Sequence, residues 1–217
     1  MVYVQCPRAQ CLPQPIAPYF VTAATLTIDL GALVANWRLL AEKCPSAECA
    51  AVVKADAYGL GVAAVAPALL AAGCTTFFVA TVDEAIALRA LLGPDPSIVH
   101  LHGPGRGEAA ALHQADIIPV LNSLEQIYEW TDFSRGFGAA LPCALHLDTG
   151  MNRLGLCAAD VGTLAREPER LTYADVRLVM SHLSTAEEAA NKVNRRQLVT
   201  DRKSTRLNSS HITISYA

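Results

Sequence analysis

Short apolar runs alternate along the chain with longer stretches in which apolar residues recur at helical spacing. The apolar runs predict six strands, at residues 50–54, 76–80, 97–102, 117–121, 143–147 and 176–181. The amphipathic or alanine-rich stretches between and after them predict helices at 62–72, 82–92, 107–114, 123–131, 158–166 and 186–199. Repeated βα units of this kind are typical of a parallel sheet that is covered by helices.

Two folds are built from consecutive βα units, the closed eight-stranded barrel and the open doubly wound sheet. No GxGxxG phosphate-binding motif follows a first strand, and the residues of chemical interest lie at the carboxyl ends of several strands. Both features favour the barrel. Because six units are two fewer than the barrel needs, we expect an incomplete (β/α)8 TIM-type barrel of α/β class, open on one side with unpaired strand edges.

The two ends of the chain differ from the middle. Residues 1–23 are rich in Pro, Cys and Gln without a period, and we interpret them as an arm of uncertain origin. Residues 24–200 carry the βα pattern and form the expected partial barrel. The last segment, DRKSTRLNSSHITISYA, has no helical period, so we interpret residues 201–217 either as translated cloning or adapter DNA or as a mobile C-terminus.

Composition excludes several classes of protein. Apolar residues make up 52% of the chain, enough for a packed core, whereas a charged fraction of 17% and a net charge of −3 make nucleic acid a poor partner. No apolar run reaches the roughly 18 to 20 residues that cross a bilayer, and the N-terminus has no signal-peptide core, so we expect a cytoplasmic protein without a membrane partner. The seven cysteines lack the CxxC pairs of a zinc site, and we expect them to be reduced.

Lys54, in the stretch AAVVKADAYGLG, ends a predicted buried strand. An amine at the carboxyl end of a barrel strand projects to where barrel enzymes carry out chemistry, and partial desolvation makes it a better nucleophile that can form a Schiff base. Tyr58, four residues later, could hydrogen-bond a bound anion. The alternative is structural, with a lysine stem that lies along the strand end and a tyrosine that caps the loop.

Two more strand ends carry candidate residues. In LHLDTGMNRLGL, residues 148–150 predict a turn and Arg153 follows it, where a guanidinium offers a planar fork for a carboxylate or phosphate. The DTG triplet does not indicate an aspartic protease, because the flanking βα pattern contradicts an all-β fold. In VMSHLSTAEE, His182 ends a strand as either a structural or a catalytic residue, and Ser184 or Thr185 predicts a helix N-cap.

The segment VHLHG places His100 and His102 on one strand face, an arrangement found in metal-dependent barrel hydrolases. No later ligands complete such a set, so we expect no metal.

Taken together, VVKADAYGLG, DTGMNRLGL and SHLSTAEE, in this order, resemble the N-terminal barrel of alanine racemase, a pyridoxal 5′-phosphate enzyme. The resemblance runs from about Thr25 to about Thr200. It implies that Lys54 holds the cofactor through an imine bond and serves as one of two bases at Cα. It places Tyr58 on the phosphate side of the cofactor, His182 beside its pyridine ring, and Arg153 near its hydroxyl and the substrate carboxylate.

The resemblance also implies alanine as the small-molecule substrate, D-alanine for peptidoglycan as the product, and a homodimer for the full-length protein. Two departures from the family pattern bear on this. His146 stands where many members carry a carbamate-modified lysine that holds the arginine, and a neutral imidazole can orient Arg153 but cannot supply the same negative charge. The remaining barrel strands and the C-terminal β domain with the opposite base are missing, and Tyr216 in the tail is not assigned that role. We therefore expect an inactive N-terminal fragment.

Three alternatives stay open at this point. The chain could be a pyridoxal-phosphate-binding carrier barrel without turnover. It could be a non-catalytic remnant that folds only with a partner over the open barrel wall. It could also be a Schiff-base aldolase barrel that uses Lys54 without any cofactor.

Overall fold

The computed structural model describes residues 26–205, with side chains as far as Arg202. Six strands form one parallel sheet in the order β1-β2-β3-β4-β5-β6. They are β1 (Ala51–Val52), β2 (Thr76–Val79), β3 (Ser97–His100), β4 (Ile117–Leu121), β5 (Leu141–Leu147) and β6 (Ala174–Ser181). Within residues 26–205 no strand joins β1 to β6, so the predicted incomplete barrel is confirmed.

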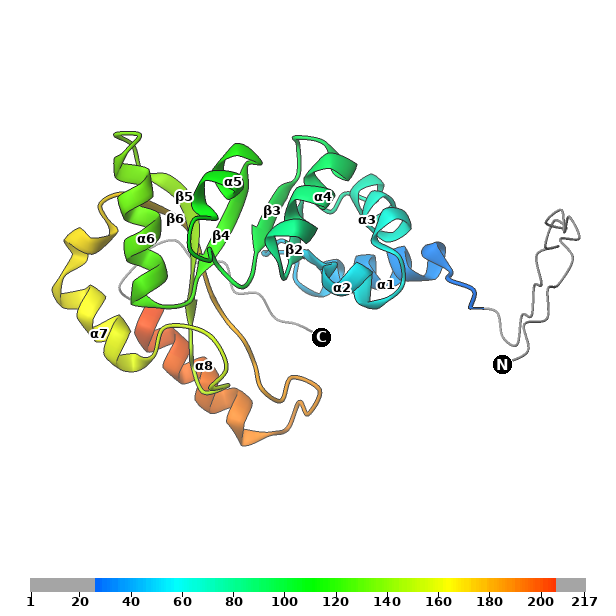
Figure 1. The fold of residues 1–217 in the computed structure, drawn as a ribbon. Helices are drawn as coiled ribbons and strands as arrows, with labels where there is room; N and C mark the ends of the chain where they lie inside the picture. The colour runs from blue at the N-terminus through cyan, green and yellow to red at the C-terminus, as the bar shows by residue number, and fades with distance from the viewer. Residues whose placement is uncertain (1–25, 206–217) are drawn as a thin grey trace, which may run out of the picture.

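Eight helices accompany the sheet within the described residues. They are α1 (Leu30–Lys43), α2 (Lys54–Tyr58), α3 (Val62–Ala71), α4 (Val82–Leu92), α5 (Ala109–Gln114), α6 (Leu124–Arg135), α7 (Ala158–Arg166) and α8 (Lys192–Thr205), with a 3-10 turn η1 (Pro168–Leu171) before β6. Figure 1 shows α3, α4, α5 and α6 following one another along one side of the sheet. No helix within residues 26–205 is both long and apolar enough to cross a bilayer.

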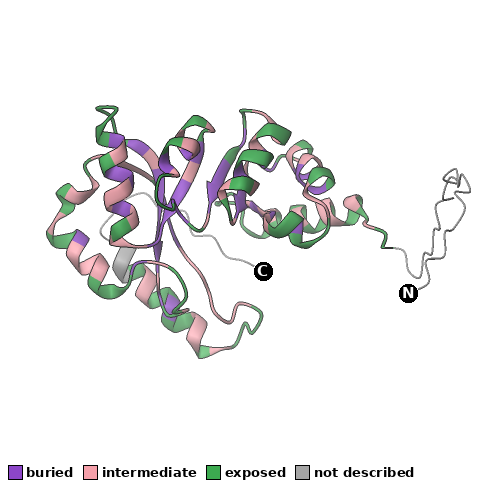
Figure 2. Ribbon diagram, in the orientation of Figure 1, coloured by how far each residue is buried: buried purple, intermediate pink, exposed green. Residues whose placement is uncertain are grey.

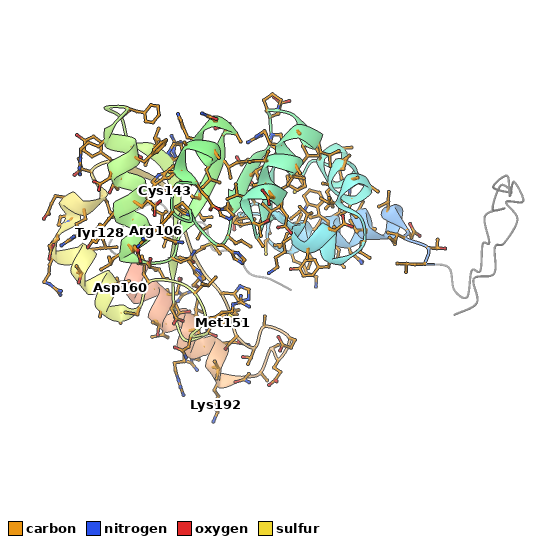
Figure 3. All side chains as sticks on the ribbon, viewed as in Figure 1. Arg106, Tyr128, Cys143, Met151, Asp160 and Lys192 are labelled. Carbon is orange, nitrogen blue, oxygen red and sulfur yellow. The ribbon has the colours of Figure 1, made fainter. Side chains whose placement is uncertain are left out.

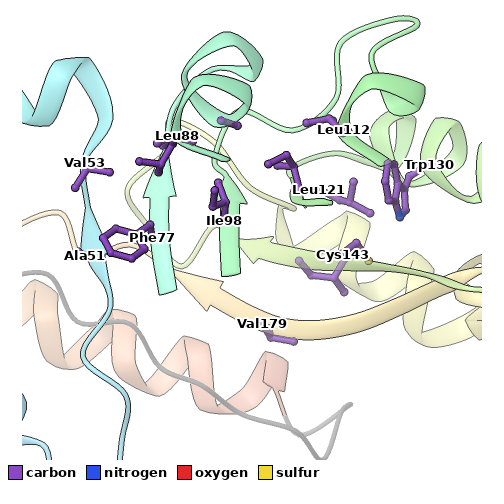
Figure 4. Packing of buried hydrophobic residues seen from close by; sticks show 14 of the residues in the cluster. Ala51, Val53, Phe77, Leu88, Ile98, Leu112, Leu121, Trp130, Cys143 and Val179 are labelled. Atoms are coloured by element: carbon purple, nitrogen blue, oxygen red, sulfur yellow. The ribbon is translucent and has the colours of Figure 1, made fainter. Parts of the chain in front are cut away.

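The chain builds apolar layers on both faces of the sheet. Because side chains alternate along a strand, Phe77 and Ile98 pack under the helices, whereas their neighbours Phe78 and Val99 pack on the inner, barrel-facing side. Figure 4 shows Phe77 and Ile98 near Leu88 of α4. Figure 2 shows the strands largely buried and the outward faces of the helices exposed. The uninterrupted apolar strand runs that predicted a parallel sheet are thus explained by burial on two faces.

Several helix starts follow from local capping. Thr81 accepts a hydrogen bond from the N–H of Glu84, and the Glu84 carboxylate accepts one from the N–H of Thr81, which makes a capping box at the start of α4. Ser123 caps α6 in the same way, through the N–H of Gln126. These polar residues fix where the chain leaves each strand rim and enters the following helix.

Three of the predicted boundaries that were wrong lie next to the candidate residues or at the end of the described chain. Strand β1 ends at Val52, because Val53 already has ψ 21° and the following residues turn left-handed, so Lys54 lies just beyond the strand. The last helix begins at Lys192 instead of residue 186, with the Asn191 side chain accepting a hydrogen bond from the N–H of Val193. It continues to Thr205, so residues 201–205 are helical despite their lack of a clear period. Residues 1–25 and 206–217 lie outside the described residues, and with them the whole predicted arm and most of the predicted tail.

Helix α1 was not predicted at all. No residue of α1 is fully buried, although Leu33, Val34 and Trp37 recur at helical spacing and pack against the core. Asp29 caps its first turn by accepting a hydrogen bond from the N–H of Ala32, and the Trp37 indole donates to the carbonyl of Cys49. Tertiary contacts near the start of β1 therefore hold this helix more than its own sequence does.

Arg89 ties together the rim at which the strands begin. Its guanidinium donates hydrogen bonds to five backbone carbonyls, those of Gly93, Pro94, Pro96, Ala115 and Asp116. These carbonyls belong to the connection from α4 into β3 and to the turn from α5 into β4. One planar cation thus sets the spacing of two successive βα units.

Replacing Arg89 by lysine is expected to lower the free energy of unfolding by about 2–4 kcal/mol, because an ammonium cannot reach carbonyls on both sides of the fork. Urea unfolding followed by circular dichroism measures the change. Arg135→Lys is the matched control, since Arg135 is exposed and contacts Asp132 one helical turn away and the Tyr173 ring, both of which a lysine ammonium can also attract, and it should cost less than about 0.5 kcal/mol. Equal losses in the two variants would contradict this role of Arg89.

Candidate functional site

A hollow of about 650 Å³ opens at the rim formed by the carboxyl ends of the strands. Its size lies within the usual range of small-molecule sites. It is lined by Val52, Lys54, Tyr58, Leu101, His102, His146, Arg153, Leu154, Met180 and His182. The structure therefore brings all four residues predicted for the site into one hollow, from the ends of β1, β5 and β6.

Lys54 begins a turn with an unusual backbone. The next four residues, Ala55, Asp56, Ala57 and Tyr58, have φ values between 52° and 56°, a left-handed conformation that costs roughly 1–2 kcal/mol for each residue with a side chain. Gly59, with φ 81°, ends the turn. Such strain persists only where surrounding contacts enforce it, and it is found most often at functional sites.

Two carboxylates hold this turn in place. Asp56 accepts a hydrogen bond from the N–H of Val62 at 2.7 Å, which fixes the exit into α3. Glu84 accepts from the N–H of Ala55 at 2.7 Å, and also from the N–H groups of Ala80 and Thr81 at the end of β2. Glu84 therefore joins the residue after Lys54 to the neighbouring strand end.

The pKa of Glu84 reflects this arrangement. Burial would raise it, but the three backbone N–H groups and the charge of His102 outweigh burial and leave the pKa below its usual value. The carboxylate form is the one that holds the turn.

Lys54 is half-buried, and its Nζ lies 6.0 Å from the centre of the Tyr58 ring. Tyr58 itself is 63% exposed. The ring thus shields one side of the ammonium while the phenol group stays open to a ligand.

The loop after β5 carries Arg153. Asp148 accepts hydrogen bonds from the N–H groups of Gly150 and Asn152, so the turn predicted from DTG is present. The loop then returns to its own strand, where the N–H of Leu156 donates to the carbonyl of His146 at 2.7 Å. A Cβ on Gly155, whose φ is 110°, would lie 2.8 Å from the nitrogen of Asp148, so this close return requires glycine.

Helix α8 fastens the Arg153 loop to the end of β6. The buried Gln197 amide donates to the hydroxyl of Thr149 and to the carbonyl of His182, and its oxygen accepts hydrogen bonds from Ser184. Figure 3 labels Met151 on this loop and Lys192 at the start of α8. Ser184, which the sequence suggested as a helix cap, instead connects the strand end to the interior of α8.

Two histidines at the rim, His146 and His182, are held toward their neutral forms. Burial, with the charges of Arg153 and Lys54, lowers the pKa of His182. Burial, with His182 and Arg153, lowers the pKa of His146 to about 4, against the opposing charge of Asp148. The hollow therefore combines two cationic side chains with neutral imidazoles.

The histidine pair of VHLHG separates at this rim. His102 lines the hollow, whereas His100 is 1% exposed and faces a smaller cavity with Thr81 and Glu108. Strand β3 ends at His100, so the alternation that would place both rings on one face does not continue. Within residues 26–205 no cluster of three or more His, Cys, Asp or Glu side chains could hold a metal ion.

Sequence reasoning missed Glu84, Gln197 and Asn122. Each forms hydrogen bonds to a segment that carries a residue lining the hollow. Glu84 is in a capping box that the sequence TVDE indicates, so its place at a helix start was open to prediction. Its bond to Ala55, 29 positions away, and that of Gln197 to Thr149, 48 positions away, carry no local sequence pattern.

Glu84→Gln is expected to lower the free energy of unfolding by about 1–3 kcal/mol, because the three N–H groups are shared between both carboxylate oxygens and glutamine replaces one of these acceptors by an NH2 group that cannot accept. A depressed folded pKa stabilises the fold above the unfolded value of about 4.3 and loses that contribution as pH falls through the folded pKa. The difference from wild type should thus be constant above about pH 5 and shrink in acid. Urea unfolding between pH 3 and 7 measures it.

Glu42→Gln, an exposed change on α1, is the matched control and should leave stability nearly unchanged at every pH. A Glu84→Gln difference that persists undiminished at the acid end of the range would refute the proposed carboxylate contribution.

Comparisons with known proteins agree with this geometry. The family model described as "Alanine racemase, N-terminal domain" matches residues 28–215. The curated alanine racemase of Methylobacterium nodulans is 51% identical over 175 residues, covering 81% of this chain and 47% of that protein. The alanine racemase of Brucella abortus is 46% identical over 173 residues, covering 80% and 44%. The chain thus spans about half the length of the curated relatives it matches.

Solved structures show the same likeness. The alanine racemase of Bartonella henselae with covalently bound pyridoxal phosphate superposes with a TM-score of 0.82 at 37% identity, over 86% of this chain and 54% of that one. Alanine racemase from Streptomyces coelicolor A3(2) gives a TM-score of 0.75 at 34% identity, over 82% and 49%. With its parallel half-barrel and the family match over most of its length, this chain belongs to the alanine racemase N-terminal domain family.

Proposed function

We propose that this chain is the pyridoxal-phosphate-binding part of an alanine racemase and that Lys54 carries the cofactor. The observation that supports this most directly is the convergence of Lys54, Arg153 and His182 on one hollow from three separate strand ends. The covalently bound cofactor of the Bartonella henselae relative supports the same assignment.

The residues present fit such a cofactor. Pyridoxal phosphate carries an aldehyde, an anionic phosphate and a flat ring, which call for an amine, a hydrogen-bond donor and a planar neighbour. Lys54, Tyr58 and His182 offer these three properties, Arg153 adds a positive charge for the substrate carboxylate, and none of the described residues that line the hollow is acidic. A site without acidic side chains favours phosphate and carboxylate ligands over cations.

The bound cofactor would supply an electron sink for the negative charge that develops at the substrate Cα. The residues of this chain do the rest. The Lys54 amine, braced through Ala55 by Glu84, binds the cofactor and then moves a proton at Cα on one face of the substrate. The Arg153 guanidinium binds the substrate carboxylate through its planar fork, and the half-buried His182 packs beside the ring. The Tyr58 hydroxyl donates a hydrogen bond to the phosphate.

Racemisation requires a proton to be removed on one face of Cα and returned on the other, so it needs two bases. Lys54 supplies one of them. We propose that the second base, and the homodimer across which it acts, belong to the half of the relatives' length that this chain does not span. On this proposal the 217-residue chain binds the cofactor without turning alanine over, and D-alanine for peptidoglycan is the product of the complete protein.

Cofactor binding is tested with the 217-residue chain and pyridoxal phosphate. Wild type should develop the visible absorbance of a lysine-bound cofactor, and Lys54→Ala should lose it, because no other amine lines the hollow among the described residues. Borohydride reduction followed by peptide mass spectrometry should place the added mass on Lys54. Lys192→Ala, at an exposed lysine of α8, is the matched control and should keep the band.

A band of equal strength in Lys54→Ala would overturn the assignment of Lys54. If no band forms but borohydride traps an added aldehyde or ketone on Lys54, the aldolase alternative is supported instead.

Racemisation is tested separately, with the cofactor-loaded chain and L-alanine. No D-alanine above the blank is expected, because only one of the two bases is present. Chiral chromatography after prolonged incubation gives the readout, with a complete alanine racemase as the positive control. Conversion of L-alanine to D-alanine by the chain, lost in Lys54→Ala, would refute the need for the missing half.

A further inference from the structure

A buried hydrogen-bonded pair lies behind the wall of the hollow. His146, near the end of β5, and Asn122, just after β4, are each 7% exposed. The His146 Nδ1 and the Asn122 Oδ1 lie 2.8 Å apart. Burying two polar side chains costs free energy unless both are hydrogen-bonded, so the partners of each side chain indicate how it is oriented.

The orientation of the Asn122 amide is fixed by its other partners. Its Nδ2 donates to the carbonyls of Leu101 at 3.0 Å and Val120 at 3.1 Å, which uses both amide protons. The Oδ1 therefore faces His146, and an amide oxygen can only accept. It follows that His146 carries its proton on Nδ1. The backbone N–H of Asn122 donates to the Gln126 side chain, which further restrains the residue.

His146 is also held neutral. Burial lowers the pKa of its ring to about 4, and the charges of His182 and Arg153 act in the same direction while Asp148 opposes them. A neutral ring with its proton on Nδ1 has a lone pair on Nε2. The ring makes no second hydrogen bond within residues 26–205, and His146 lines the hollow. The titratable side chains that face this hollow from the other strand ends are Lys54, Tyr58, His102, Arg153 and His182.

We propose that Asn122 is a positioning residue that locks His146 in its Nδ1–H tautomer, so that the Nε2 lone pair accepts a hydrogen bond from the Arg153 guanidinium when a ligand is bound. Arg153 is exposed in this structure, and its loop is bonded to the backbone of His146 through Leu156. The guanidinium and the lone pair are thus carried by two segments that are hydrogen-bonded to each other, and both side chains line the same hollow.

The consequence is electrostatic. A carboxylate partner would neutralise most of the guanidinium charge, whereas a neutral imidazole satisfies one N–H and leaves the full positive charge for the ligand. We therefore infer that the ligand held by Arg153 is anionic, in keeping with a substrate carboxylate. Only this choice of ligand rests on the proposed function; the tautomer and the role of Asn122 do not.

The tautomer can be observed directly by ¹⁵N NMR of the histidine side chains in the chain without cofactor. Wild-type His146 should show a protonated Nδ1, an unprotonated Nε2 and no titration above about pH 5, since its pKa is about 4. In Asn122→Ala the tautomer should become mixed, because the acceptor for Nδ1–H is lost. His113, on the outer helix α5, is the internal control and should not change.

Asn122→Asp keeps the size and the acceptor but adds a negative charge. It should raise the pKa of His146 by about 1–3 units, because a carboxylate next to Nδ1–H stabilises the imidazolium. A ring whose pKa is raised from about 4 into the range of about 5–7 carries a proton on Nε2 in mildly acidic solution, where the wild-type ring does not, and that Nε2 can no longer accept from Arg153. A wild-type ring protonated on Nε2, or tautomer populations unchanged in Asn122→Ala, would overturn the proposal, and the wild-type measurement decides this even if a variant fails to fold.

The contact with Arg153 needs its own measurement, with acetate as the anionic probe. Addition of the probe should move the ¹⁵N resonance of His146 Nε2 in the wild type and leave it in place in Arg153→Gln. Arg166→Gln, a change on the surface of α7, is the matched control and should behave as wild type. An Nε2 resonance that responds equally in Arg153→Gln would overturn this step. None of these readouts requires pyridoxal phosphate. A failure of cofactor binding through Lys54 can therefore be distinguished from a failure of the proposal about Asn122 and His146.

Discussion

Parallel pairing of consecutive strands is the constraint on which the site depends. Because β1 to β6 all run in one direction and pair in chain order, their carboxyl ends meet at a single rim, and the residue that follows each strand is delivered there. Lys54, Arg153 and His182 are up to 128 positions apart along the sequence and still face one hollow. The apolar layers on both faces of the sheet constrain its register, because a shift by one residue would exchange Phe77 with Phe78 and Ile98 with Val99 between two layers that pack against different neighbours.

The rim itself is built from polar side chains that bind backbone groups of neighbouring segments. Glu84 holds the left-handed turn that presents Lys54, and Gln197 holds the Arg153 loop against the end of β6. Each does so by satisfying N–H or C=O groups that would otherwise be left without a partner at a loop. The functional groups can then stand at fixed places although the backbone around them is irregular. Positive charge from Lys54 and Arg153, set against neutral imidazoles, gives the hollow its preference for anions.

Much of the fold could be predicted from periodicity. The bounds of β4, α4 and α7 match the predicted ranges, and the other predicted strands overlap the observed ones. Prediction failed where local pattern and tertiary contact disagree. The sequence alone extends the first strand to Lys54, but the chain leaves the strand after Val52 and enters a left-handed turn that Glu84 and Asp56 hold. Helix α1 was missed although its apolar residues recur at helical spacing, and it packs against the core without burying any residue fully. The acidic residues after Thr185 suggested a first helical turn, but Asn191 starts the helix several residues later.

The sequence by itself determined the class of fold, the number of βα units and the four residues Lys54, Tyr58, Arg153 and His182, because alternation, helical period and motif wording are local properties of the chain. Only the tertiary structure decided that Glu84 braces the lysine turn and that Asn122 faces the ring of His146. These partners come from distant strands and helices, and their hydrogen bonds depend on distances and directions that no stretch of sequence contains. The charge state of His146 was likewise decided by burial among Arg153 and His182, which exists only once the sheet has formed.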